Sequence, residues 1–208
     1  SNMGKNRIIL PLSVFLIASL SAYFYTGKVQ KDASTVVMVE EEEVHPMPEL
    51  LKLRVQNLKA ESITLGSMNE DYKLIYFGQL SASDLDWEAV LKMQRLALQN
   101  FPKQLSLIFI SLDPTRDTKA KLQKLFSPSA KNVEVLYPRE NDLIYLTKAY
   151  GVHFQVSNLA NSLLNYTIDH NTWYFLTTPD YRILGSYPIQ IADERLEKEI
   201  IAHMKQKH

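Results

Sequence analysis

The sequence predicts an α/β fold in which a mixed β-sheet is covered by helices on both faces. Apolar runs typical of buried strands alternate with helical patterns between residues 72 and 151, and a helix between two strands implies parallel neighbours. Two further strand patterns joined by TPDY predict a hairpin, which adds antiparallel neighbours. With 46% apolar and 22% charged residues, the composition is that of a globular protein.

The predicted strands are short runs rich in apolar residues. Two of them flank a turn at the start of the domain. The third is a buried strand, and the fourth is too apolar to alternate, as expected for a strand covered on both faces. In order, the strand patterns are LRVQNL (53–58), SITLGSM (62–68), YKLIYFG (72–78), LSLIFISLD (105–113), VEVLYP (133–138) and the hairpin within NYTIDHNTWYFLTTPDYRILGSYP (165–188). The polar stretch before this hairpin is predicted to be a loop.

Four helices are predicted between and after these strands. The first has Ser83 as its N-cap, and apolar residues follow at helical spacing. The third ends at Gly151 as its C′ residue, and the fourth is capped by Asp193. The last three helical patterns are KAKLQKLFS (119–127), ENDLIYLTKAYG (140–151) and DERLEKEIIAHMKQK (193–207). This order of strands and helices is a thioredoxin-like arrangement.

Three predicted segments precede the folded domain at residues 49–208. Residues 1–7 are interpreted as a tag remnant before Met3 and a short cytoplasmic N-terminus. Residues 8–26 are apolar and predict a transmembrane anchor, with a cleavable signal segment as the alternative. Residues 27–48 contain the run EEEE and two prolines, which predict a flexible acidic linker.

The composition argues against several classes of function. Lysine plus arginine and aspartate plus glutamate number 23 each, so no basic excess indicates nucleic-acid binding. The chain has no cysteine, which excludes disulfides, thiolate metal sites and thiol catalysis. A hydrolase is also not indicated, because the sharp glycine-flanked serine turn of many hydrolases is missing. We therefore expect no enzymatic activity.

Three stretches, in the same order and spacing, resemble the Sco/SenC family of envelope copper chaperones that serve cytochrome c oxidase assembly. They are YFG (76–78), FISLDPTRDT (109–118) and TIDHNTWYFLTTPDYRIL (167–184). The resemblance implies a thioredoxin-like fold with an N-terminal membrane anchor. It also implies a bacterial inner-membrane location with the domain in the periplasm, and a mitochondrial inner membrane is the alternative.

The resemblance further indicates which residues stand at the family's metal positions. Ala82 and Asp86 take the places of the two cysteines of the family's CxxxC loop, and His170 takes the place of its histidine. Cu(I) prefers thiolates, so a methyl group and a hard carboxylate make the family's copper and thiol–disulfide activities unexpected here. Asp84, Asp86 and His170 could hold a harder divalent cation weakly. Alternatively, both aspartates are charges favoured at a helix N-terminus, and His170 is a bystander held by hydrogen bonds of the hairpin.

Two further features have structural and functional interpretations. Within DPTRDT, Pro114 fixes a turn, while Asp113, Arg116 and Asp117 are predicted to pair and to cap the following helix. Trp87 stands where the family usually has proline. An exposed indole at this position would anchor a partner protein, and burial against the core is the alternative.

Together these observations predict a membrane-tethered, non-enzymatic Sco-like domain that needs no cofactor and binds another envelope or membrane protein. The alternative is a metal-handling protein related to oxidase assembly. It would bind copper or another divalent metal at an altered site formed by Asp86 and His170.

Overall fold

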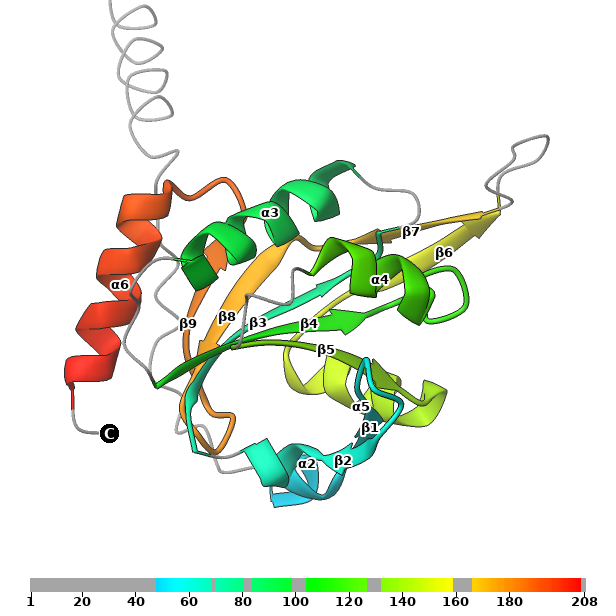
Figure 1. Ribbon diagram of the computed structural model, residues 1–208, viewed down its shortest axis with the longest axis horizontal. Coiled ribbons are helices and arrows are strands. Elements are labelled where there is room, and N and C mark those ends of the chain that lie inside the picture. Colours follow the sequence, from blue (N-terminus) through cyan, green and yellow to red (C-terminus); the bar gives the residue numbers. More distant parts are fainter. Residues whose placement is uncertain are drawn as a thin grey trace, which may run out of the picture. The chain divides into compact units, whose positions relative to one another are not determined.

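The computed structural model describes residues 48–68, 70–80, 84–98, 104–126, 132–158 and 166–206 (Figure 1). Contacts divide the chain into two units, and all described residues belong to the second, Met38–His208. The predicted segments 1–7 and 8–26, and the predicted linker up to residue 47, lie outside the described residues. None of the helices in the described ranges is long and apolar enough to cross a membrane.

A seven-stranded mixed sheet forms the centre of the domain, as predicted. Its strand order is β2-β1-β5-β4-β3-β8-β9. The central strands β3, β4 and β5 are parallel, whereas β8 and β9 at one edge and β1 and β2 at the other run antiparallel to their neighbours. The bounds are β1 Arg54–Gln56, β2 Ser62–Thr64, β3 Tyr72–Gly78, β4 Leu105–Ser111, β5 Val133–Pro138, β8 Trp173–Thr177 and β9 Ile183–Pro188.

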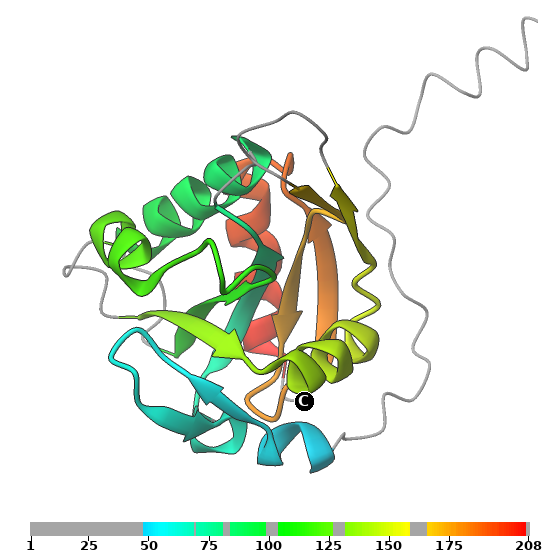
Figure 2. The ribbon, with the colours of Figure 1, turned by 90° about the vertical axis from the view of Figure 1, so that its right-hand side faces the viewer.

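Helices cover both faces of this sheet (Figure 2). On one face lie α3 (Asp84–Leu98), α4 (Lys119–Leu125) and α6 (Asp193–Lys205); on the other lie α2 (Pro48–Lys52), the 3₁₀ helix η1 (Leu65–Met68) and α5 (Glu140–Ala149). Successive residues of β3 alternate between the two cores. Leu74 and Tyr76 pack on the side of α3, whereas Ile75 and Phe77 pack on the side of α5.

The structure corrects the prediction for the region before β8. β6 (Phe154–Asn158), predicted to be loop, pairs antiparallel with β7 (Tyr166–His170) in a separate two-stranded sheet. β7 was predicted to belong to the final hairpin, but only β8 and β9 form that hairpin. The sequence FQVSN of β6 alternates apolar and polar residues only over Phe154 to Ser157, a signal at the short limit for a strand, and among the described strands β6 pairs only with β7.

Two predicted helix caps were wrong and one was confirmed. Thr118, rather than Asp113 or Asp117, caps α4, because its side chain accepts a hydrogen bond from a backbone N–H of the first turn. Asp193 is the first residue of α6 and makes no capping hydrogen bond, since its carboxylate binds the guanidinium of Arg95. Gly151 follows α5 with a φ of 63°, as predicted for a C′ glycine.

Candidate functional site

The candidate site lies where β3 ends and α3 begins. Ala82 and the predicted N-cap Ser83 lie outside the described residues, so the site is built from Asp86 and the groups around it. Asp86 is in the first turn of α3 and is 0% exposed. It points inward because it shares the helix face of Ala89 and Met93, three and seven residues further along, which are both buried.

The Asp86 carboxylate accepts hydrogen bonds from Tyr76, Gln79 and His170. The Tyr76 hydroxyl donates to Oδ1. The backbone N–H of Gln79 donates to Oδ2 over 3.2 Å, and Nε2 of His170 lies 3.0 Å from the same oxygen. The His170 side chain is only 3% exposed, so these contacts are sealed from solvent. A carboxylate this deeply buried needs such donors to offset its lost hydration.

The contacts of His170 favour the doubly protonated imidazolium form. Its Nδ1 lies 3.0 Å from the carbonyl oxygen of Asn171, which can only accept, so Nδ1 carries a proton. Nε2 faces the Asp86 carboxylate and also donates. Burial lowers the pKa of His170, but its hydrogen bond to Asp86 and the charge of that carboxylate outweigh burial and raise the pKa above its ordinary value. His170 and Asp86 therefore form a buried imidazolium–carboxylate pair.

Two residues at the end of β3 shape the space for this pair. Burial, together with the charge of Asp86, raises the pKa of Tyr76, so its hydroxyl stays protonated and donates. At Gly78 a Cβ atom would lie 2.8 Å from Oδ1 of Asp86 and 2.7 Å from the Tyr76 ring. Glycine is required at this position because any side chain would displace the carboxylate or the phenol.

The weak-metal hypothesis grouped Asp84 with Asp86 and His170, but only the last two are in contact. Asp84 is exposed and stands two residues from Asp86, a spacing that does not bring helical side chains together. Within the described ranges, no group of three or more His, Asp and Glu side chains is arranged to hold a metal ion. Asp84 and Asp86 lie in the first turn of α3, where the helix-end interpretation put them, and His170 hydrogen-bonds the Asn171 carbonyl. In addition, Asp86 and His170 contact each other.

The side chains available as metal ligands, Asp86 and His170, do not fit the Cu(I) that the resemblance implies. A Cu(I) site needs soft ligands, and this chain has no thiolate to offer. The carboxylate of Asp86 is hard and already accepts from Tyr76 and His170. Both nitrogens of His170 face hydrogen-bond acceptors inside the protein, so neither is directed toward an open ligand position.

The DPTRDT segment braces this site from the side of β4. The Asp117 carboxylate accepts from the backbone N–H of Leu80 at 3.0 and 3.1 Å and from the Ser111 hydroxyl at 3.1 Å. Pro114 lies in the exposed turn between β4 and α4, as predicted. Asp117 therefore fixes the backbone just after β3, a structural role different from the predicted helix cap.

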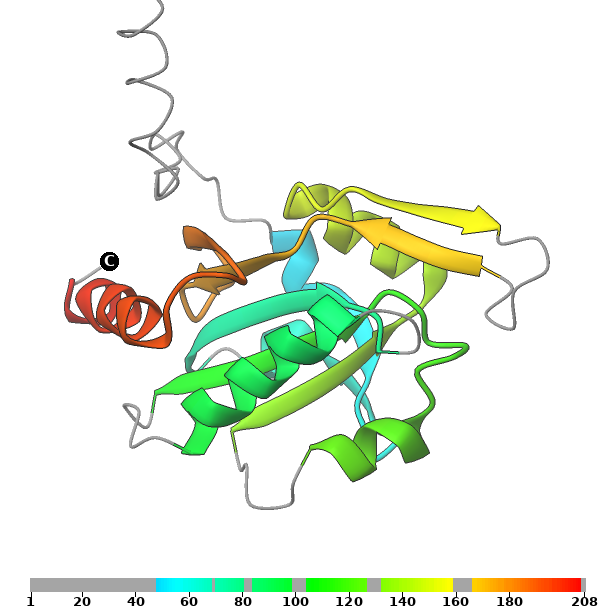
Figure 3. The same ribbon diagram turned by 90° about the horizontal axis from the view of Figure 1, so that it is seen from above.

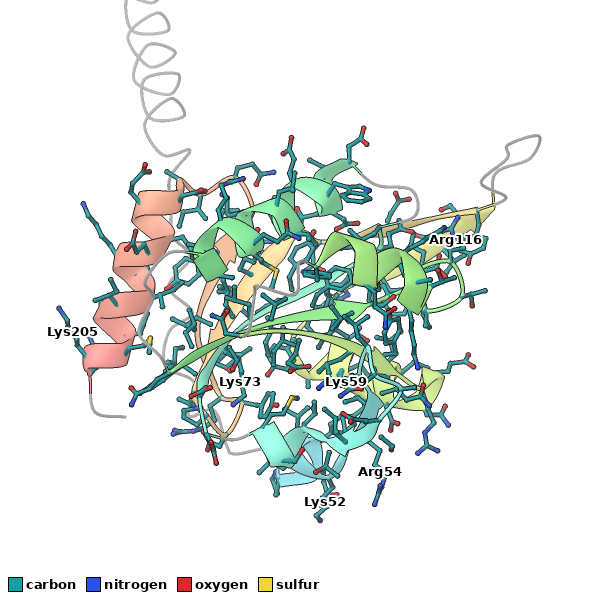
Figure 4. The ribbon with its side chains drawn as sticks, in the orientation of Figure 1. Lys52, Arg54, Lys59, Lys73, Arg116 and Lys205 are labelled. Carbon is teal, nitrogen blue, oxygen red and sulfur yellow. The ribbon has the colours of Figure 1, made fainter. Side chains whose placement is uncertain are left out.

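Arg116 ties the strand that carries His170 to the strand end next to Asp86. Its guanidinium donates to the backbone oxygen of Tyr166 over 2.6 Å, to Oε1 of Gln79 over 3.1 Å and to the carboxylate of Asp113, confirming the predicted pair. It also lies 3.6 Å from the centroid of the Tyr166 ring. Gln79 in turn donates to the backbone oxygen of Ile168 over 2.7 Å. Figure 4 places Arg116 beside the β6–β7 sheet.

Three residues of this network, Tyr76, Gln79 and Tyr166, were not predicted from the sequence. A signal was available for Tyr76, because a phenol within an apolar strand requires a buried hydrogen-bond partner. Gln79 directly follows YFG, and a polar amide next to a buried strand is a weaker indication of a buried hydrogen bond. No local pattern marks Tyr166.

Trp87 is partly exposed, at 39%, so its predicted burial was wrong. Its indole Nε1 donates to the backbone oxygen of Leu80 over 3.0 Å. This hydrogen bond fixes the indole at the start of α3 while leaving part of the ring accessible.

These features define a thioredoxin-like α/β domain with a cysteine-free, internally paired site at the first helix turn after β3. The SCO1/SenC family model matches residues 54–205, and the chain belongs to this family. One SCO2-like protein of Rickettsia prowazekii is 27% identical over 189 residues, which cover 88% of this chain and 96% of that protein. A second from the same organism is 25% identical over 125 residues, covering 59% and 61%.

Solved structures show the same fold. Arabidopsis thaliana ScoI with copper bound is 18% identical, with a TM-score of 0.63 over 74% of this chain and 97% of that one. Yeast Sco1 with copper bound is 20% identical, with a TM-score of 0.62 over 75% and 88%. The three-dimensional similarity therefore extends over nearly the whole of those domains.

Proposed function

We propose that this protein is a membrane-tethered SCO1/SenC domain that has exchanged its metal site for a buried ion pair and acts without enzymatic activity, by binding another protein. The observation that supports this proposal is the Asp86–His170 pair. The two side chains are 0% and 3% exposed, and in this proposal they take the places of a cysteine ligand and the histidine of the family's metal site.

The energetics of the pair oppose metal binding. A metal ion would have to remove a proton from His170 and displace the hydrogen bonds that reach Asp86 from Tyr76 and Gln79. Breaking a buried ion pair costs about 3–5 kcal/mol, and the ligands released are one imidazole and one hard carboxylate. In this proposal the pair joins α3 to β7 and keeps the fold intact without a metal.

The proposed partner is another envelope or membrane protein. The apolar segment 8–26 would tether the domain, the acidic linker 27–48 would separate it from the membrane, and the domain would face the periplasm of a bacterial envelope. The partly exposed Trp87, fixed by its hydrogen bond to Leu80, is a suitable contact residue because partner surfaces are often built around rigid aromatic side chains.

A Cu(I) titration in competition with a chromophoric chelator tests the proposal. We expect the full chain in detergent to leave the chelator saturated, and His170→Ala to behave identically. Stoichiometric, sub-micromolar copper binding that is lost in His170→Ala would refute the metal-free function.

A second candidate function, handling of a harder divalent metal, is favoured by one observation. The structure already places Nε2 of His170 and Oδ2 of Asp86 within 3.0 Å of each other, so one proton lost from the imidazole would leave two ligands side by side. Calorimetric titration with Zn²⁺ at pH 8 distinguishes the two functions. Micromolar binding with proton release, abolished by Asp86→Asn, would favour this candidate, whereas no binding heat supports the metal-free proposal.

A further inference from the structure

The outward face of α3 exposes an unusual share of the apolar surface. Among the described residues, the large apolar side chains that are exposed are Leu85, Trp87, Leu91, Ile144, Tyr145 and Val156. The first three lie on the first two turns of α3, at 48%, 39% and 45% exposure. Figure 3 shows α3 crossing in front of the sheet, with no described element over its outward side.

A row on α3, exposed at Asp84, Trp87 and Leu91 and half-buried at Gln94, follows the spacing of a helix-pairing seam. Asp84, Trp87, Leu91 and Gln94 succeed each other at intervals of three, four and three residues, which places them in one row along the helix. The opposite row, with Ala89 and Met93, is already buried against the sheet. In the outward row, Trp87 and Leu91 are therefore accessible to another molecule.

Charges beside this row make the face complementary to itself. Glu88 is exposed and precedes Leu91 by three residues, whereas Arg95 follows it by four and is 53% exposed at its side chain. Arg95 directs Nε and Nη2 toward Asp193, at 2.8 and 3.3 Å. A two-fold axis near Leu91 would bring two α3 helices together in antiparallel orientation and set each Glu88 beside Arg95 of the other copy.

We propose that the occupant of this face is a second copy of the chain, with the two α3 helices antiparallel across a two-fold axis near Leu91. The Leu91 side chains meet at the axis, the Trp87 rings flank them, and two Glu88–Arg95 pairs border the seam. A single helix face is smaller than the roughly 1,600 Å² of a stable complex, so the dimer is weak and forms at high local concentration. This inference goes beyond the proposed function and does not depend on whether the site binds a metal. It gives Trp87 a contact that competes with the envelope partner for the same side chain.

The absence of cysteine in the natural sequence allows a site-specific test. Leu91→Cys and Ile144→Cys each introduce one thiol at a similarly exposed apolar position, 45% and 41%, on α3 and on α5 across the sheet. The full chain, held in membranes, is treated with a short bismaleimide, and covalent dimer is followed over time. We expect covalent dimer to form about tenfold faster with Leu91→Cys than with Ile144→Cys, because a specific contact raises the effective concentration of one thiol near the other.

Charge variants distinguish the specific dimer from random collision. In the Leu91→Cys background, Glu88→Arg should remove most of the rate advantage, and adding Arg95→Glu should restore part of it. Circular dichroism checks that each variant is folded. Equal cross-linking rates at the two positions, insensitivity to Glu88→Arg, or cross-linking of Leu91→Cys only to other proteins would each overturn the self-association.

Discussion

Replacing Asp86 by asparagine breaks the buried ion pair while keeping the side-chain volume nearly unchanged. The amide nitrogen can turn toward the Tyr76 hydroxyl, which is able to accept, and the amide oxygen can still accept from the backbone of Gln79. The loss falls on His170. Its two ring nitrogens face the introduced neutral amide and the Asn171 carbonyl, so it must either stay charged without a counterion or give up one hydrogen bond.

The size of the effect follows from the burial of both partners. Removing one partner of a buried pair costs about 3–5 kcal/mol when the other charge remains. His170 can lose its proton in the variant, which limits the loss, because the remaining penalty is then that of an unsatisfied buried group, about 1–3 kcal/mol. We therefore expect the free energy of unfolding to fall by about 3 kcal/mol near pH 6, a large fraction of the stability of a typical domain.

The pH dependence has a definite sign. Because the pKa of His170 is raised in the folded state, its stabilising contribution is complete below its ordinary value of about 6.5 and is lost as the pH rises through the raised value. Urea unfolding followed by circular dichroism at pH 6 and pH 9 measures this. The difference between the natural protein and Asp86→Asn should be larger at pH 6.

Asp84→Asn is the matched control, because Asp84 is an exposed carboxylate in the same helix turn. Its loss should stay within about 1 kcal/mol, the range of helix-end electrostatics. Equal losses for the two variants, or a loss for Asp86→Asn that does not change with pH, would refute the assignment of a buried ion pair. Strict additivity of Asp86→Asn with His170→Gln would refute it as well.

Three further variants test other parts of the structure. Arg116→Ala should lower the free energy of unfolding by about 3 kcal/mol and speed amide hydrogen exchange in β6 and β7, since the guanidinium holds that sheet; unchanged exchange would argue against the tether. Lys73 is fully buried, and burial lowers its pKa to about 8 in the folded protein. Between this pKa and the ordinary value of 10.5, the unfolded chain therefore binds more protons than the folded chain. In urea unfolding the natural protein should therefore gain stability relative to Lys73→Met between pH 7.5 and 9.5, and a relative loss would contradict this. Finally, Ala82→Cys combined with Asp86→Cys should create tight binding of about one Cu(I) under reducing, anaerobic conditions, whereas parental affinity in a folded variant would show that the assumed loop alignment is wrong.

Much of the fold follows from local patterns in the sequence. β3 and β4 are apolar on both faces, which marks them as central strands, and Gly151 supplies the left-handed residue that ends α5. The short strand β6 has no such pattern, and its conformation depends on hydrogen bonds to β7. The local sequence pattern predicts an element that packs directly against the core. It fails to predict a strand whose conformation depends on hydrogen bonds to a partner strand.

The motifs led to the prediction that Asp86 and His170 stand at the family's metal positions, and the absence of thiols led to the prediction that the copper chemistry is lost. The structure shows that Asp86 points inward, because it shares the buried face of α3 with Ala89 and Met93. What only the tertiary structure decided is that these two side chains neutralise each other. They are 84 residues apart, and their contact depends on the packing of β7 against the end of β3. Because both side chains are buried there, each is stabilised by the opposite charge of the other.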